Sequence, residues 1–83
     1  MSGVVVTVYT RQGCGLCGQA EALVAGLAEG RAAVELVDVD AEPALAERYG
    51  PRVPVVAVAG VEIAEGVVDA ATVAEALDAS GGI

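Results

Sequence analysis

Short apolar runs alternate with amphipathic stretches along the chain, which predicts a small α/β protein. Residues 4–9 form a β-branched apolar run that is typical of a buried strand. Residues 16–28 repeat apolar side chains at helical spacing and precede Gly30, which predicts a helix that stops there. The apolar positions of this helix are Leu16, Ala20, Leu23, Val24 and Leu27. Residues 33–38 predict a second strand, and the helical crossover makes the two strands parallel.

Two further helices are expected, each after an aspartate that suits an N-cap. Asp40 is the expected N-cap of a helix that continues to residue 49 and ends at Gly50. Asp69 is the expected N-cap of the final helix, in which Val73 and Leu77 lie four residues apart on one face.

A hairpin is expected between these two helices. Residues 54–59 and 61–64 predict two strands, and their tight connection at Gly60 makes them antiparallel. The resulting element order is strand, helix, strand, helix, hairpin, helix.

The two cysteines of the chain are Cys14 and Cys17, and they lie between the first strand and the first helix. A thiol at a helix N-terminus is exposed to partial positive charge, which stabilises the thiolate. The three-residue separation brings both side chains to one face of the first turn, where a disulfide can close without moving the backbone. This spacing therefore indicates a reversible two-electron switch.

Two other interpretations of the cysteine pair are less favoured. Structural zinc sites need four protein ligands, and the chain has no histidine and no third cysteine. A disulfide that closes so small a loop removes little conformational entropy from the unfolded chain, so a purely structural disulfide here would add little stability.

The composition limits the size and setting of the protein. Eighty-three residues suit a single domain, and 55% hydrophobic residues with only 2% aromatic ones imply a core of Val, Ala and Leu. Apolar stretches fall short of the roughly 20 residues that span a bilayer, and the first residues lack the features of a secretory signal. One cysteine pair in such a chain fits a reducing cytosol, so we expect a cytoplasmic protein.

The net charge of −8 argues against nucleic acid and anionic membranes as partners. Phosphate contacts need Lys and Arg, and the chain has four arginines and no lysine. We expect a monomer whose partners are a disulfide-containing protein substrate and a reductase that donates electrons.

Four sequence blocks follow one another along the chain. They are residues 9–17 (YTRQGCGLC), 37–40 (VDVD), 48–50 (RYG) and 52–54 (RVP). On these blocks, taken in this order, the chain resembles the thioredoxin fold, and more narrowly its glutaredoxin-like branch of small bacterial proteins. The resemblance implies one thioredoxin-like domain over residues 1–83, with a four-stranded mixed sheet in the order 2-1-3-4 flanked by three helices.

The catalytic chemistry is assigned to the two cysteines. Cys14, at the helix start, is expected to be the nucleophile that forms a mixed disulfide, and Cys17 then attacks Cys14 to release the partner; the resemblance implies the same roles. Gly15 keeps the approach to the sulfurs open, and Leu16 replaces the proline or tyrosine of typical family motifs. Glu21 lies four residues after Cys17, where a solvent-facing carboxylate and a proton relay both fit.

Val53 and Pro54 form the second part of the predicted site. From the sequence alone, Pro54 could simply begin a strand. The resemblance implies instead a cis peptide bond that lies across from the cysteines. The backbone of Val53 would then pair with an extended substrate segment.

Substrate contacts are expected from residues on both sides of the cysteines. The resemblance places Arg11 where a basic residue meets the glutathione carboxylate, and the charge of Arg11 could also lower the pKa of the thiol. Arg52 stands where a threonine is common in glutathione-using members, and their Gly-Gly-Asp signature is reduced to Gly66 and Asp69. We therefore expect weak glutathione binding. The predicted substrate-binding residues are Arg11, Gly15, Leu16, Arg52, Val53 and Pro54.

The sequence favours a thiol–disulfide oxidoreductase that reduces protein disulfides and has no bound cofactor. Its electron donor is glutathione or a thioredoxin-reductase-like flavoenzyme. The alternative is a binding module in which Cys14 and Cys17 of two protomers hold a metal ion or an iron–sulfur cluster. A thioredoxin-fold scaffold with incidental cysteines is the third possibility.

Overall fold

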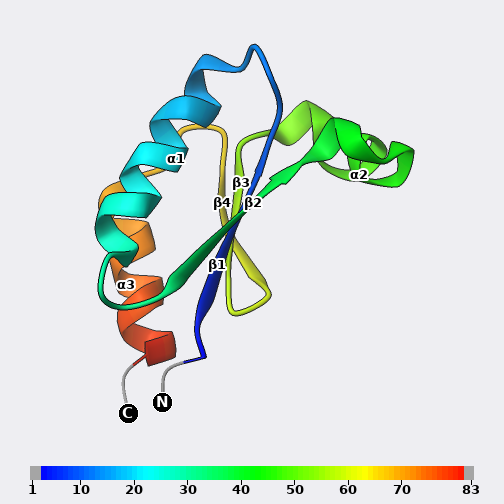
Figure 1. The fold of residues 1–83 in the computed structure, drawn as a ribbon. Coiled ribbons are helices and arrows are strands. Elements are labelled where there is room, and N and C mark those ends of the chain that lie inside the picture. Colours follow the sequence, from blue (N-terminus) through cyan, green and yellow to red (C-terminus); the bar gives the residue numbers. More distant parts are fainter. Residues whose placement is uncertain (1–2, 82–83) are drawn as a thin grey trace.

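The computed structural model describes residues 3–81 and contains the expected alternation of strands and helices (Figure 1). Two short 3-10 turns, η1 and η2, flank the second helix. The elements in chain order are β1 (Val5–Thr10), α1 (Gly15–Ala28), β2 (Ala33–Asp38), η1 (Val39–Ala41), α2 (Pro43–Tyr49), η2 (Gly50–Arg52), β3 (Val55–Val58), β4 (Val61–Glu65) and α3 (Ala70–Gly81).

The four strands form one mixed sheet in the order β2-β1-β3-β4, which confirms the predicted fold. β1 is parallel to β2 and antiparallel to β3, and β3 is antiparallel to β4. The register aligns Tyr9 with Val55 and Val55 with Glu65. The loop after β1, the loop before β3 and the loop after β4 therefore meet at one end of the sheet, where α1 and α3 begin (Figure 1).

The main hydrophobic core lies between the sheet and the helices α1 and α3, which pack against each other (Figure 1). Burying one such aliphatic side chain stabilises the fold by about 1.5–3 kcal/mol. The buried members of this main core are Val6, Val8, Val24, Val56, Val58, Val73 and Leu77.

The buried side of α1 is displaced from the stripe predicted for this helix. Cys17 and Val24 are buried, whereas Leu16 is 42% exposed. Because each residue turns the helix by about 100°, Leu16 lies roughly a quarter turn away from the line through Cys17 and Val24. Leu16, which the sequence places among the apolar positions of this helix, therefore lies outside its buried side.

A second, smaller core lies beside α2. Val39, Tyr49 and Val55 are buried there, and the side chains of Tyr9, Leu45 and Val53 pack against them. The rings of Tyr9 and Tyr49 are stacked, with centroids 3.9 Å apart and an interplanar angle of 13°.

The predicted N-cap at Asp40 is wrong. Asp40 lies inside η1, and the N-cap of α2 is Glu42, which makes no side-chain capping hydrogen bond. Pro43 explains the difference, because a proline suits the first helical position but forces the preceding residue into extended backbone. Glu42 has φ −140° and ψ 139°, so one helix cannot run through it from Asp40.

The cap predicted at Asp69 is confirmed, since the backbone N–H of Thr72 donates to the carboxylate of Asp69 at 3.3 Å. Within residues 3–81, none of the helices combines the length and the apolar character needed to cross a membrane.

Candidate functional site

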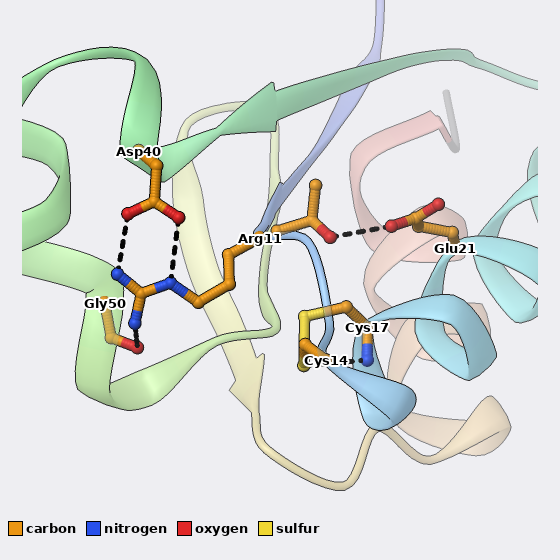
Figure 2. Close-up of a disulfide and its surroundings, with 7 residues drawn as sticks. Arg11, Cys14, Cys17, Glu21, Asp40 and Gly50 are labelled. Carbon is orange, nitrogen blue, oxygen red and sulfur yellow. Dashed lines mark hydrogen bonds and ion pairs between the residues drawn. A yellow bond between two sulfur atoms is a disulfide. The ribbon is translucent and has the colours of Figure 1, made fainter.

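The two cysteines lie at the end of the sheet where the three loops meet. They are joined as a disulfide, with Cα atoms 5.2 Å apart (Figure 2). Cys14 is the N-cap residue of α1 and is half-buried, whereas Cys17 lies inside the first turn and is only 1% exposed. An incoming thiol or disulfide can therefore reach Cys14 far more easily than Cys17.

The start of α1 is suited to negative charge on Cys14. The backbone N–H of Cys17 donates to the sulfur of Cys14 at 3.2 Å. In the first turn of α1, all of which the structure describes, no side chain is acidic. A thiolate on Cys14 would thus be stabilised by a hydrogen bond and by the positive end of the helix dipole.

Pro54 lies at the same end of the sheet as the cysteines. The Val53–Pro54 peptide bond is cis, as the family resemblance implied. Pro54 is buried, and its carbonyl accepts a 2.9 Å hydrogen bond from the N–H of Gly66 in the loop after β4. Val53 is half-buried with extended backbone (φ −61°, ψ 145°). Substrate pairing by Val53 stays a prediction.

Arg11 is directed away from the disulfide and toward η1 and η2 (Figure 2). Its Nε and Nη2 donate to the two carboxylate oxygens of Asp40 at 3.1 and 2.7 Å, and its Nη1 donates to the carbonyl of Gly50 at 3.2 Å. The hydrogen bond between the two side chains is the main cause that raises the pKa of Arg11 and lowers the pKa of Asp40. The predicted contact of Arg11 with substrate would have to compete with this ion pair.

Arg52 is also paired with carboxylates. Its Nη1 donates to Glu62 at 3.1 Å and to Glu65 at 2.9 Å, both on β4. Its guanidinium also lies 5.4 Å from the ring centroid of Tyr49. The hydrogen bonds to Glu62 and then Glu65 raise the pKa of Arg52. Its predicted role as a substrate-binding residue stays a prediction.

Exposed apolar side chains occur at the same end of the molecule. Leu16 follows the helix start directly, and Val67, in the loop after β4, is 80% exposed. Sequence reasoning missed Val67, although an apolar residue between Gly66 and the cap Asp69 is a signal that could have found it. Asp69 itself is engaged in capping α3.

Glu21 has a defined partner. The hydroxyl of Thr10, at the end of β1, donates to the carboxylate of Glu21 at 2.7 Å, and Glu21 is half-buried (Figure 2). Glu21 is therefore held against the strand next to the cysteine loop rather than being a freely solvated carboxylate. Its predicted role as a proton relay stays a prediction.

The potential metal ligands of this chain are two cysteines and twelve carboxylates. In residues 3–81, His, Cys, Asp and Glu side chains form no group of three or more that could hold a metal ion. The iron–sulfur alternative needs ligands from two protomers and stays a prediction.

Comparison with known proteins agrees with the geometry. Residues 5–78 match the family described as "Glutaredoxin-like domain (DUF836)". Among proteins with curated descriptions, none matches the chain.

Solved structures share this fold. The chain is similar to a mutant thioredoxin from Halobacterium salinarum NRC-1 (TM-score 0.76, 32% identity), which it matches over 99% of its own length and 78% of the other's. It is also similar to the target protein XcR50 from X. campestris, with TM-score 0.74 and 36% identity over 89% and 96% of the two chains. A malaria parasite thioredoxin-2 with 16% identity supports the fold alone (TM-score 0.70, 93% and 82% covered). Fold, family and cysteine pair together support a thiol redox function.

Proposed function

Because the chain belongs to the glutaredoxin-like domain family, we propose that it is a thiol–disulfide oxidoreductase that reduces disulfides of protein substrates through Cys14 and Cys17. The contrast between the two cysteines carries this proposal. Cys14 is accessible and accepts a backbone N–H on its sulfur, whereas Cys17 is buried one turn further along. This asymmetry suits a nucleophile and a resolving thiol.

The reaction consists of two exchanges. The thiolate of Cys14 attacks one sulfur of the substrate disulfide, which forms a mixed disulfide and releases the other substrate sulfur as a thiolate that takes up a proton. Cys17 then gives up its proton and attacks the sulfur of Cys14. The Cys14–Cys17 disulfide forms, the second substrate thiol leaves, and two electrons have passed to the substrate.

A donor must then reduce the Cys14–Cys17 disulfide, and we propose a flavoenzyme of the thioredoxin-reductase type rather than glutathione. Arg11 and Arg52 are paired with carboxylates, and Asp69 caps a helix. A glutathione ligand would need these three side chains as its cationic and polar partners, but each of them is already bound to another group of the protein. We place the reaction in the cytoplasm, because a lone cysteine pair suits a reducing compartment.

Reduction of insulin disulfides tests the proposal. The purified protein is assayed with NADPH plus thioredoxin reductase and, in parallel, with NADPH, glutathione reductase and glutathione. We expect turnover that is faster with the first system and absent in Cys14→Ser. If dithiol-reduced protein transfers no electrons to insulin, the proposed function is wrong.

The metal-binding alternative is checked on the same preparation. Anaerobic purification followed by a visible absorption spectrum and metal analysis should show no cluster in the active protein. A stoichiometric cluster bound by a dimer would favour the binding module instead.

A further inference from the structure

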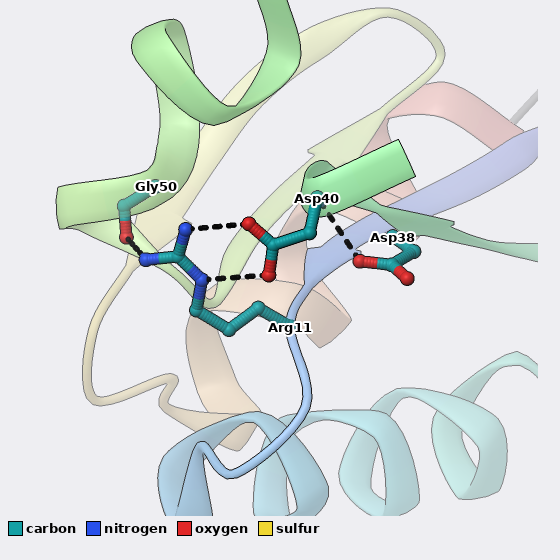
Figure 3. Close-up of polar contacts among 4 residues, drawn as sticks. All are labelled: Arg11, Asp38, Asp40 and Gly50. Carbon is teal, nitrogen blue, oxygen red and sulfur yellow. Dashed lines mark hydrogen bonds and ion pairs between the residues drawn. The ribbon is translucent and has the colours of Figure 1, made fainter. Parts of the chain in front are cut away.

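Arg11 connects three segments of the chain that are distant in sequence. It lies in the loop after β1, three residues before Cys14, and it contacts Asp40 in η1 and Gly50 at the junction of α2 and η2 (Figure 3). We propose that Arg11 is a positioning residue: together with Asp40 and Gly50 it fixes the cysteine loop against the segment that leads to Pro54. This inference rests on the proposed function and replaces the substrate-binding role predicted for Arg11.

The contact with Asp40 has the geometry of a positioning device. Both carboxylate oxygens accept from the guanidinium, and such paired hydrogen bonds fix the orientation of the arginine as well as its distance. Asp40 is held in turn, because its own N–H donates to the carboxylate of Asp38 at 2.9 Å (Figure 3). The polar chain therefore runs from the end of β2 through Arg11 to η2.

Gly50 leaves room for this contact. A Cβ atom at residue 50 would lie 3.2 Å from Nη2 and 3.3 Å from Nη1 of Arg11, which is tighter than ordinary van der Waals contact. The backbone of Gly50 is right-handed helical (φ −47°, ψ −51°), so glycine is not required there by the backbone conformation. The close approach of the guanidinium gives a physical reason for glycine at this position.

The positive charge of Arg11 is largely neutralised by the carboxylate of Asp40. The guanidinium is directed away from the disulfide (Figure 2). A thiolate on Cys14 is therefore stabilised by the helix start rather than by Arg11. Since Pro54 follows Gly50 by only four residues, loss of the contact should loosen the segment that leads to Pro54 at the cysteine end of the sheet. Substrate docking should weaken, and the sulfur chemistry should stay unchanged.

Variants of Arg11 and Asp40 test this inference. We would compare Arg11→Gln, Arg11→Lys, Asp40→Asn and the double variant Arg11→Gln/Asp40→Asn with the wild type. The control is Asp78→Asn, which breaks the exposed ion pair between Arg31 and Asp78. That pair joins the turn before β2 to α3, away from the cysteine end of the sheet. The measurements are KM and kcat for insulin, the pH profile of Cys14 alkylation, and hydrogen exchange at residues 50–53, where Gly50, Arg52 and Val53 carry a backbone N–H and Pro51 does not.

We expect Arg11→Gln and Asp40→Asn each to raise KM about 1.5- to fivefold, the range for losing an exposed ion pair, with kcat and the alkylation profile unchanged. The double variant should be no worse than either single one, because both remove the same contact. Lysine keeps the positive charge but lacks the planar guanidinium that donates to both carboxylate oxygens of Asp40. KM should therefore stay raised in Arg11→Lys. Hydrogen exchange at residues 50–53 should become faster in these variants and stay unchanged in Asp78→Asn.

Three results would overturn the inference. A shift of the alkylation profile in Arg11→Gln but not in Asp40→Asn would mean that Arg11 acts on the thiolate. A raised KM in Arg11→Gln that Arg11→Lys restores and Asp40→Asn does not share would mean that Arg11 binds substrate. Unchanged hydrogen exchange in all variants would show that no segment is positioned. If the wild type reduces no disulfide, the proposed function fails, while the exchange measurement still decides the positioning role.

Discussion

The two hydrophobic cores of this molecule differ in what holds them together. The main core beneath α1 and α3 consists of valine and leucine side chains from strands and helices that lie in regular layers. The second core, beside α2, has only three buried members among the described residues, and one of them is Tyr49. Around it, Arg11 and Arg52 add ion pairs to Asp40 and to β4.

The difference matters because each core supports one part of the site. Cys17 is buried in α1 on the side of the main core, so the cysteines rest on the part of the fold with the most apolar burial. Val53, which precedes Pro54, packs on the second core instead. We infer that the main core holds the two cysteines in place, whereas the second core and its ion pairs affect the affinity for substrate.

The largest effect is expected at the cysteines themselves. Cys14→Ser should abolish turnover, because no thiolate remains at the helix start to attack the substrate. Cys17→Ser should trap a mixed disulfide between Cys14 and the partner, visible as a covalent adduct on a non-reducing gel. In the reduced wild type, iodoacetamide at neutral pH should modify Cys14 first. Faster alkylation of Cys17 would reverse the two roles.

Truncating one leucine side chain in each core should separate effects on the stability of the fold from effects on substrate binding. Leu77→Ala leaves a cavity in the main core and should cost about 2–5 kcal/mol in the free energy of unfolding, with activity per folded molecule preserved. Leu45→Ala removes a half-buried side chain from the second core and should cost about 1 kcal/mol, yet raise KM. Urea unfolding and insulin kinetics on both variants check this. Equal KM values for the two would remove the functional distinction between the cores.

The same contrast explains what the sequence could predict. The main core follows from local patterns: the β-branched run before Cys14, the helical spacing and the cap at Asp69 all depend on neighbours within one element. The second core depends on contacts between distant residues. Asp40 was predicted to cap its own helix, but its partner is Arg11, which lies 29 residues away. Likewise, the pairing of Arg52 with Glu62 and Glu65 follows from how β3 and β4 align, which no local pattern specifies.

A change at Tyr49 should have an intermediate effect on the second core. Tyr49→Leu removes the stack on Tyr9 and should cost about 0.5–1.5 kcal/mol beyond the lost apolar area. The hydrogen bond with Tyr49, followed by burial, raises the pKa of Tyr9, so this pKa should fall toward its ordinary value.

The effect on Tyr9 can be measured directly. Because the chain has two tyrosines and no tryptophan, ultraviolet titration of Tyr49→Leu reports on Tyr9 alone. Tyr49→Phe is the matched control, which keeps the stacked ring and loses the hydroxyl. It should lower the pKa of Tyr9 with a smaller loss of stability. A pKa of Tyr9 that stays high in both variants would contradict the assigned cause.

The smallest expected effect is the pH dependence of the Arg11–Asp40 pair. The pKa of Asp40 is lowered in the folded protein, chiefly by its hydrogen bond to Arg11, so ionised Asp40 stabilises the fold. This contribution is present above the unfolded value of about 3.9 and is lost as the pH falls through the lower folded value. The melting temperature of the wild type should therefore be slightly higher than that of Asp40→Asn at neutral pH. This gap between the two melting temperatures should close in acid. Because the pair is exposed, added salt should narrow the gap as well. In an Arg11→Gln background the carboxylate has lost its partner, so Asp40→Asn should no longer produce a pH-dependent gap. A gap that is constant from neutral to acid pH would show that Asp40 contributes through packing rather than charge.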